Sequence, residues 1–123
     1  MSRNRFSGTI PTSLGKFQDK LIQVGFSENL LSGTIPSFLV KKGSPLESLI
    51  LSENNISGSI PSVLGLARDL RALFLSSNAL TGEIPLQLGN NLKLEYLEFG
   101  GNFLSGTIPK TLKNLSNLCK YPY

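Results

Sequence analysis

Residues 46–61 read Leu-Glu-Ser-Leu-Ile-Leu-Ser-Glu-Asn-Asn-Ile-Ser-Gly-Ser-Ile-Pro, and variants of this stretch recur along the whole chain. Its final motif, Gly-x-Ile-Pro, occurs five times, at intervals of 25, 25, 24 and 24 residues. The motifs begin at Gly8, Gly33, Gly58, Gly82 and Gly106. A constant period of this length predicts a repeat protein in which each repeat is one coil of a stack.

A second pattern, Leu-x-x-Leu-x-Leu-x-x-Asn-x-Leu, precedes four of the five motifs in the same phase. Its alternation of apolar residues predicts a short strand with one buried face. The asparagine after the strand carries donors and an acceptor, so a buried amide there can bond to the backbone of its own coil and of the neighbouring coil. We therefore predict a structural ladder formed by Asn29, Asn54, Asn78 and Asn102.

One such coil cannot bury its leucines alone, but stacked coils share a continuous core. The segments after Gly-x-Ile-Pro are short and bounded by glycine and proline, which predicts 3₁₀ or irregular turns on the convex face. We expect one α/β-type repeat solenoid over residues 1–123, with about five to six repeats of 24–25 residues, partial first and last repeats, and a parallel β-sheet on the concave face. In the last partial repeat, Tyr121 and Tyr123 take the places of two leucines.

The composition excludes several classes of function. With 123 residues, 40% of them hydrophobic and 16% charged, the chain is expected to fold as one domain. It has no histidine and a single cysteine, Cys119, which excludes histidine-based triads, histidine metal sites, an internal disulfide and multi-cysteine zinc sites. Phosphate-binding, dinucleotide-binding and kinase motifs do not occur. We therefore expect no catalytic residues, no metal and no cofactor.

The sequence also bears on membranes and nucleic acids. No apolar run approaches the ~18 residues of a membrane span, and the first residues lack the apolar stretch of a signal peptide. The net charge is +4, but the basic residues are scattered without interleaved aromatic residues. Nucleic acid is therefore not an expected partner.

The repeated Leu-Ser-Gly-x-Ile-Pro block, at residues 31–36 and 104–109 with variants at 56–61 and 80–85, resembles the plant-specific class of leucine-rich repeats. By this motif the chain resembles the ectodomains of plant leucine-rich-repeat receptor kinases and receptor-like proteins, and it is also similar to polygalacturonase-inhibiting proteins. The resemblance implies a right-handed horseshoe segment, a second short sheet along residues 32–35 and their equivalents, and a location outside the cell or at its surface.

Some parts of that family have no counterpart in this sequence: the cysteine-containing N-terminal cap, the C-terminal cap, the membrane helix and the kinase. We therefore expect the chain to be a fragment or a truncated gene product, with any kinase activity in a missing C-terminal domain. Because solenoids need capping repeats, open ends predict either fraying of residues 1–15 and 115–123 or end-to-end self-association. Sequons that begin at Asn55 and Asn114 are candidate N-glycosylation sites for an exported chain.

Residues between the strand leucines are expected to point outward on the concave face. Ile50, Phe74 and Tyr96 would then form an apolar patch on adjacent strands, which is a candidate hot spot for a protein or peptide ligand. The alternative is that these side chains only cover one another on the pleated surface.

Five of the eight acidic residues also fall at strand positions, where only Arg71 and Lys120 oppose them. They are Glu28, Glu47, Glu53, Glu95 and Glu98. We predict an acidic face that attracts a basic partner, and the candidate ligand-binding residues therefore include Arg71, Glu28, Glu53 and Glu98. The alternative is a solvated surface on which Glu47, Arg71 and Glu95 form an ion-pair ladder.

These features favour a non-catalytic module that recognises a protein or peptide on its concave face, as in a plant signalling receptor of this class. A defence protein that resembles the polygalacturonase inhibitors is a second hypothesis. A structural fragment without independent function is a third. The first rests on the apolar patch, the second on the family resemblance and the third on the missing caps.

Overall fold

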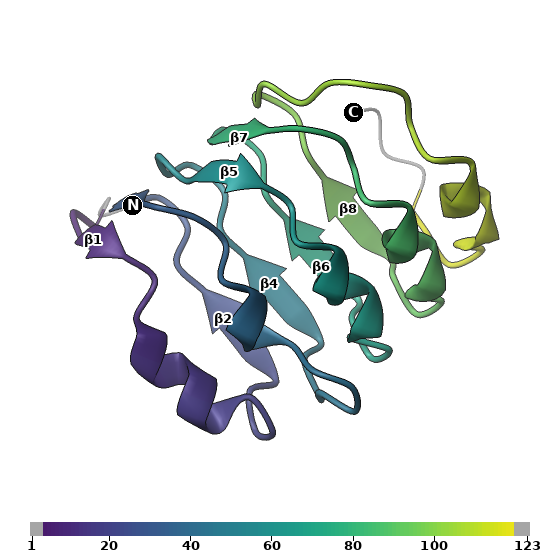
Figure 1. The fold of residues 1–123 in the computed structure, drawn as a ribbon, viewed down its shortest axis with the longest axis horizontal. Helices are drawn as coiled ribbons and strands as arrows, with labels where there is room; N and C mark the ends of the chain where they lie inside the picture. The colour runs from purple at the N-terminus through teal and green to yellow at the C-terminus, as the bar shows by residue number, and fades with distance from the viewer. Residues whose placement is uncertain (1–3, 120–123) are drawn as a thin grey trace.

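The computed structural model describes residues 4–119, which form a stack of similar coils (Figure 1). A parallel sheet runs along the concave face of the stack in the order β2–β4–β6–β8, so that each coil pairs with the next coil in the chain. Its strands are β2 (Gln23–Gly25), β4 (Ser48–Ile50), β6 (Ala72–Phe74) and β8 (Tyr96–Glu98). The register aligns equivalent repeat positions, with Leu49 paired to Leu73 and Leu73 paired to Leu97.

The return segments are short 3₁₀ helices, as the sequence predicts. They are η1 (Thr12–Phe17), η2 (Ser37–Leu39), η3 (Ser62–Leu66), η4 (Leu86–Asn90) and η5 (Lys110–Asn114). Each begins directly after the proline of a Gly-x-Ile-Pro motif, and the proline is extended, with ψ between 127° and 132°. Because proline fixes φ, every coil starts its turn at the same point of the repeat. Within residues 4–119, no helix has the length and apolar character needed to cross a bilayer.

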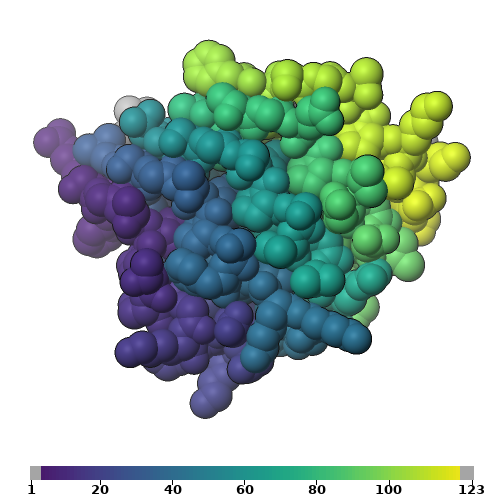
Figure 2. All heavy atoms as spheres, viewed as in Figure 1, coloured from purple at the N-terminus to yellow at the C-terminus, as the bar shows by residue number. Residues whose placement is uncertain are grey.

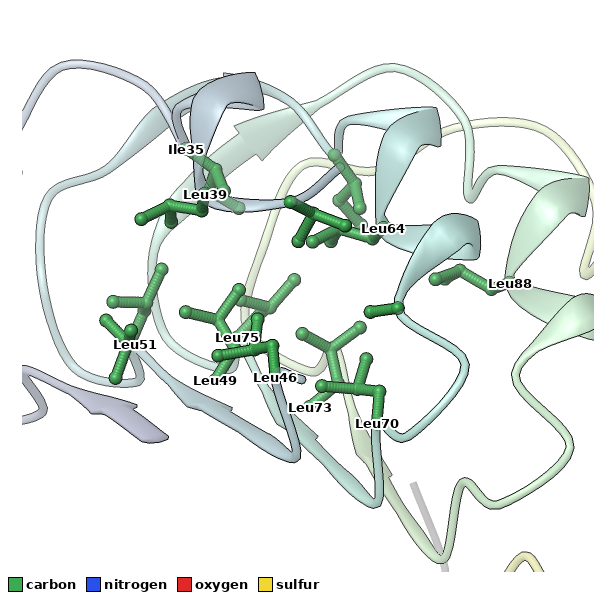
Figure 3. Close-up of a cluster of buried hydrophobic side chains, with 14 of the residues drawn as sticks. Ile35, Leu39, Leu46, Leu49, Leu51, Leu64, Leu70, Leu73, Leu75 and Leu88 are labelled. Atoms are coloured by element: carbon green, nitrogen blue, oxygen red, sulfur yellow. The ribbon is translucent and has the colours of Figure 1, made fainter. Parts of the chain in front are cut away.

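The leucines of the repeat fill the space between the sheet and the turns (Figure 3). The leucines at the three strand positions of the two middle coils have no exposed surface. They are Leu46, Leu49, Leu51, Leu70, Leu73 and Leu75. From the opposite side, the turns contribute Leu39, Leu64 and Leu88 to the same cluster. Since each buried leucine contributes about 1.5–3 kcal/mol, this shared core holds neighbouring coils together.

A second set of short strands lies beyond the asparagine corner, and it is broken into pairs (Figure 1). The strands are β1 (Ser7–Thr9), β3 (Leu30–Ser32), β5 (Ser57–Ser59) and β7 (Ala79–Thr81). Strand β1 pairs with β3, and β5 pairs with β7, both in parallel. Between these pairs, Thr34 makes an isolated bridge to Ser57.

The break follows from a stagger between coils. Strands β1 and β5 run through Gly8 and Gly58, which have φ of +93° and +77°, at repeat positions equivalent to 32–34. Each pairs with the next coil two repeat positions earlier, as Ser7 does with Leu30, and beyond β3 the pairing continues through the bridge of Thr34 to Ser57. The second sheet is therefore present, and β1 and β5 fall within the expected strip of residues 32–35 and its equivalents, whereas β3 begins two residues earlier.

The glycines of the Gly-x-Ile-Pro motif also make room for the preceding coil. A Cβ on Gly33 would lie 2.9 Å from Cγ2 of Thr9, and a Cβ on Gly58 would lie 2.9 Å from Cγ2 of Thr34. Gly58, like Gly33, has a positive φ, of 77°. Both the backbone conformation and the closeness of the neighbouring coil therefore select glycine at this point of the repeat.

The coils appear as successive bands across the molecular surface (Figure 2). The first partial coil adds β1 and η1, and neither partial coil adds a concave strand within residues 4–119. In the last coil, the N–H of Cys119 donates to the carbonyl of Glu95 at 2.7 Å, so the bonding between coils continues to this point. The predicted strand positions Tyr121 and Tyr123 lie outside the described residues. In the coil that contains β8, Phe103 and Ile108 are 72% and 63% exposed.

Candidate ligand-binding face

Three large apolar side chains lie together on the concave sheet. The register places Ile50 directly beside Phe74, whereas Tyr96 pairs with Ala72 and so lies diagonally from Phe74. The rings of Phe74 and Tyr96 are 6.2 Å apart between centroids and inclined by 35°. Ile50 and Phe74 are half-buried, and Tyr96 is 41% exposed. We call Ile50, Phe74 and Tyr96 the apolar patch.

A row of hydroxyl groups runs beside the apolar patch and ends at a carboxylate. Oγ of Ser76 lies 3.0 Å from Oγ of Ser52 and 3.4 Å from Oε2 of Glu98. Ser76 donates its one hydroxyl proton to Ser52 at the shorter distance, and the Glu98 carboxylate lies at the longer one. Glu98 is also the register partner of Phe74, which places the carboxylate next to the apolar patch.

The ion-pair ladder expected along the first column forms only in part. Nη1 of Arg71 lies 2.6 Å from Oε1 of Glu95. Among the residues that the structure describes, Glu47 takes no part in an ion pair. An exposed pair of this kind contributes only about 0–1 kcal/mol to stability, so its main effect is to compensate the charge of Arg71.

The two remaining candidate acids, Glu28 and Glu53, lie at the rim of the face. They line an open hollow of about 420 Å³ together with Asn4, Arg5 and Leu30. The first partial coil brings Arg5 to this hollow, so a basic residue outside the strand positions also lies near these two acids. Lys120 lies outside the described residues.

The backbone at this rim has an unusual conformation. Glu28 and Glu53 have φ of +56° and +57°, and the equivalent residues Ser77 and Gly101 have +55° and +68°. The apolar pattern does not predict this conformation. The sequence signal for it is Gly101, because a glycine directly before a ladder asparagine marks a position that can take a positive φ.

The asparagine ladder ties each rim position to the preceding coil. Oδ1 of Asn54 accepts from the N–H of Leu31 at 2.9 Å, and its Nδ2 donates to the carbonyl of Phe26 at 2.8 Å. Within its own coil, Nδ2 also donates to the carbonyls of Leu51 and Ser52, at 3.1 and 3.2 Å. One amide thereby provides partners for backbone groups of two coils.

The other ladder asparagines make the same bond between coils. Each accepts from a backbone N–H of the preceding coil at 3.0 or 3.1 Å, and they are Asn29, Asn78 and Asn102. Asn29 and Asn78 are each only 8% exposed. The strands of the candidate face are therefore held in a fixed register.

The remaining candidate positions lie at the surface. The side chains of Asn55 and Asn114, the two sequon asparagines, are exposed, as is the free thiol of Cys119. Within residues 4–119, histidine, cysteine and acidic side chains do not gather in groups of three or more that could hold a metal ion.

Comparisons with known proteins agree with this architecture. The leucine-rich repeat family matches residues 45–66, 69–91 and 93–115, which together make up more than half of the chain. A search among curated proteins finds no match. Solved structures, in contrast, give high similarity over nearly all of the chain.

Two of these structures are large plant receptors from Arabidopsis. The receptor kinase HAESA, solved with the peptide hormone IDA and the co-receptor SERK1, is 43% identical with a TM-score of 0.87, over 96% of this chain and 20% of that chain. The ectodomain of GASSHO1/SCHENGEN3, solved with CASPARIAN STRIP INTEGRITY FACTOR 2, is 40% identical with a TM-score of 0.86, over 96% of this chain and 14% of that chain. This chain therefore spans a fifth or less of those receptors.

A smaller ectodomain is covered more completely. The BIR2 ectodomain from Arabidopsis thaliana is 35% identical with a TM-score of 0.78, over 94% of this chain and 65% of that chain. The chain therefore belongs to the leucine-rich repeat family, and the solved structures that it resembles are ectodomains of plant receptors.

Proposed function

We propose that this chain is a non-catalytic recognition module that binds a peptide or protein ligand on its concave face. The observation that carries the proposal is the ring pair of Phe74 and Tyr96, with Ile50 beside it, on an open sheet. Support comes from the similar receptor HAESA, which was solved with a peptide hormone and a co-receptor. A module of this kind would act outside the cell or at its surface, where Asn55 and Asn114 could carry glycans.

The physical properties of the face suit this role. Clustered aromatic side chains bury a large area at low cost in side-chain entropy, and they are enriched among hot-spot residues. The asparagine ladder fixes the strands beneath the apolar patch, so the face loses little freedom when a ligand binds. The exposed carboxylates around the patch favour a ligand with basic groups.

Selection of ligands from a random displayed-peptide library against the full chain tests the proposal. We expect the selected peptides to lose at least tenfold in affinity when Phe74→Ala is introduced, because a hot-spot side chain is worth about 2 kcal/mol or more. Phe103→Ala is the matched control, since Phe103 is exposed but lies outside the concave strands. The selected peptides should bind this variant as tightly as they bind the unchanged chain.

The proposal would be contradicted if the selected peptides bound the Phe74→Ala variant and the unchanged chain equally well. Their binding site would then lie away from the apolar patch. Circular dichroism and urea denaturation of both variants show whether the coil stack is intact, so that a loss of binding is not confused with a loss of folding.

A further inference from the structure

We propose that the concave face recognises a guanidinium group, the side chain of an arginine in the ligand, at a site formed by Phe74, Tyr96 and Glu98. This inference rests on the proposed function and names the chemical group that the same face would select.

The ring pair supplies the first half of the site. Phe74 and Tyr96 lie on adjacent strands with their centroids 6.2 Å apart, and Tyr96 is 41% exposed. The face of an aromatic ring carries negative charge density and attracts a cation within about 6 Å of the centroid. A planar guanidinium can in addition stack on the ring.

The carboxylate supplies the second half. Glu98 lies directly beside Phe74 in the sheet register and two residues after Tyr96, so it projects from the same face as both rings. Oγ of Ser76 lies 3.4 Å from Oε2 of Glu98, so the carboxylate lies on the same side of the sheet as the rings and the hydroxyl row.

The surrounding charges favour a cation at this point. The four described concave strands and their flanks contain one basic residue, Arg71. These ranges are residues 22–28, 47–53, 71–77 and 95–101. The charge of Arg71 is already compensated, because Nη1 lies 2.6 Å from Oε1 of Glu95. Glu47 and Glu53, which are both exposed, add negative potential on the same sheet. A cationic ligand group is therefore complementary to this face.

Guanidinium fits the site better than an ammonium group. It can place its plane against an aromatic ring while its N–H groups donate in pairs to a carboxylate. The ammonium of lysine is a compact and strongly hydrated point charge that cannot do both. The site therefore predicts a preference for arginine over lysine.

Titration of the isotope-labelled full chain, followed by NMR, tests this with three probes. They are N-acetyl-argininamide, N-acetyl-lysinamide and N-acetyl-citrullinamide, of which the last has nearly the shape of the first without its charge. We expect the arginine probe to shift the ring signals of Phe74 and Tyr96, with Kd on the order of 10 mM. The lysine probe should bind more weakly, and the citrulline probe should leave these signals in place.

Three variants locate the charge that is recognised. Glu98→Gln should weaken binding of the arginine probe by up to about fivefold, the range of an exposed ion pair. Glu83→Gln, the same substitution at an exposed position outside the concave strands, should leave the affinity nearly unchanged. Glu53→Gln, at the rim of the same face, should weaken binding less than Glu98→Gln. Equal binding of arginine and citrulline probes would overturn the proposal. A loss with Glu53→Gln but not with Glu98→Gln would also overturn it, because the cation would then bind in the rim hollow.

The two proposals can fail separately. Displayed peptides that depend on Phe74 but lack arginine and tolerate Glu98→Gln would preserve the recognition function and remove the guanidinium site. If the arginine probe shifts the ring signals but no displayed peptide depends on Phe74, the guanidinium site stands and the peptide-binding function fails.

Discussion

Replacing Gly58 with alanine tests whether the Gly-x-Ile-Pro motif is required for stacking. Gly58 has φ +77°, and a side chain in this left-handed conformation costs about 1–2 kcal/mol. The added Cβ would also lie 2.9 Å from Cγ2 of Thr34 in the preceding coil, and overpacking of this kind costs about 1–3 kcal/mol. We therefore expect Gly58→Ala to lower the free energy of unfolding by about 2–5 kcal/mol.

Two other glycines separate these contributions. Gly43 has φ +82°, but nothing lies within 4 Å of its ideal Cβ, so Gly43→Ala should cost only the conformational part of about 1–2 kcal/mol. Gly25 in β2 has neither a positive φ nor a neighbour within 4 Å, so Gly25→Ala should be neutral or slightly stabilising. Combining Gly58→Ala with Thr34→Ser, which removes Cγ2, should recover most of the overpacking cost.

Urea denaturation of the full chain, followed by far-ultraviolet circular dichroism, measures all of these variants under one condition. If Gly58→Ala destabilised the chain no more than Gly25→Ala, the reasoning about this glycine would be refuted. If Gly58→Ala cost as much as Gly43→Ala and Thr34→Ser changed nothing, the backbone conformation alone would select glycine.

Asn78→Ala should lower the free energy of unfolding by about 1–3 kcal/mol, because it leaves buried backbone groups of two coils without partners. The same substitution at exposed Asn55 should cost less than about 0.5 kcal/mol, and equal costs in urea denaturation would contradict the ladder. Leu73→Ala should cost about 2–5 kcal/mol by the same assay, since the side chain is fully buried between coils, and a cost below about 1 kcal/mol would mean that the coils pack loosely there. Lys93→Ala should change stability by less than about 1 kcal/mol, because its ion pair with Asp69 is exposed, and thermal denaturation at low and high salt checks this.

The stack itself could be predicted because its information is repeated in every coil. Leucines at Leu49 and Leu73 predict a buried strand face, and Gly-x-Ile-Pro predicts a fixed turn, so each copy supports the others. The register between coils then follows from the period alone. It correctly places Ile50 beside Phe74.

Other features depend on local geometry that the period does not contain. The hydroxyl row from Ser52 to Glu98 requires a diagonal contact across two strands, which a column-by-column reading does not reveal. The break in the second sheet comes from a two-residue stagger between paired coils, in which Ser7 pairs with Leu30 rather than with its equivalent Ser32. Arg5 could not be placed in the rim hollow because it lies in a partial coil with few pattern positions to align.

The asparagine ladder has a mechanical consequence. The hydrogen bonds of Asn54 and Asn78 reach no further than 28 residues along the chain, so each links a coil only to itself and to the coil before it. Under a stretching force applied to the two termini, a coil could detach without disturbing the coils further inside. Each detachment would release one repeat, roughly 80–90 Å of contour length. A force–extension trace of this chain should therefore show evenly spaced steps, and their spacing would measure the repeat directly.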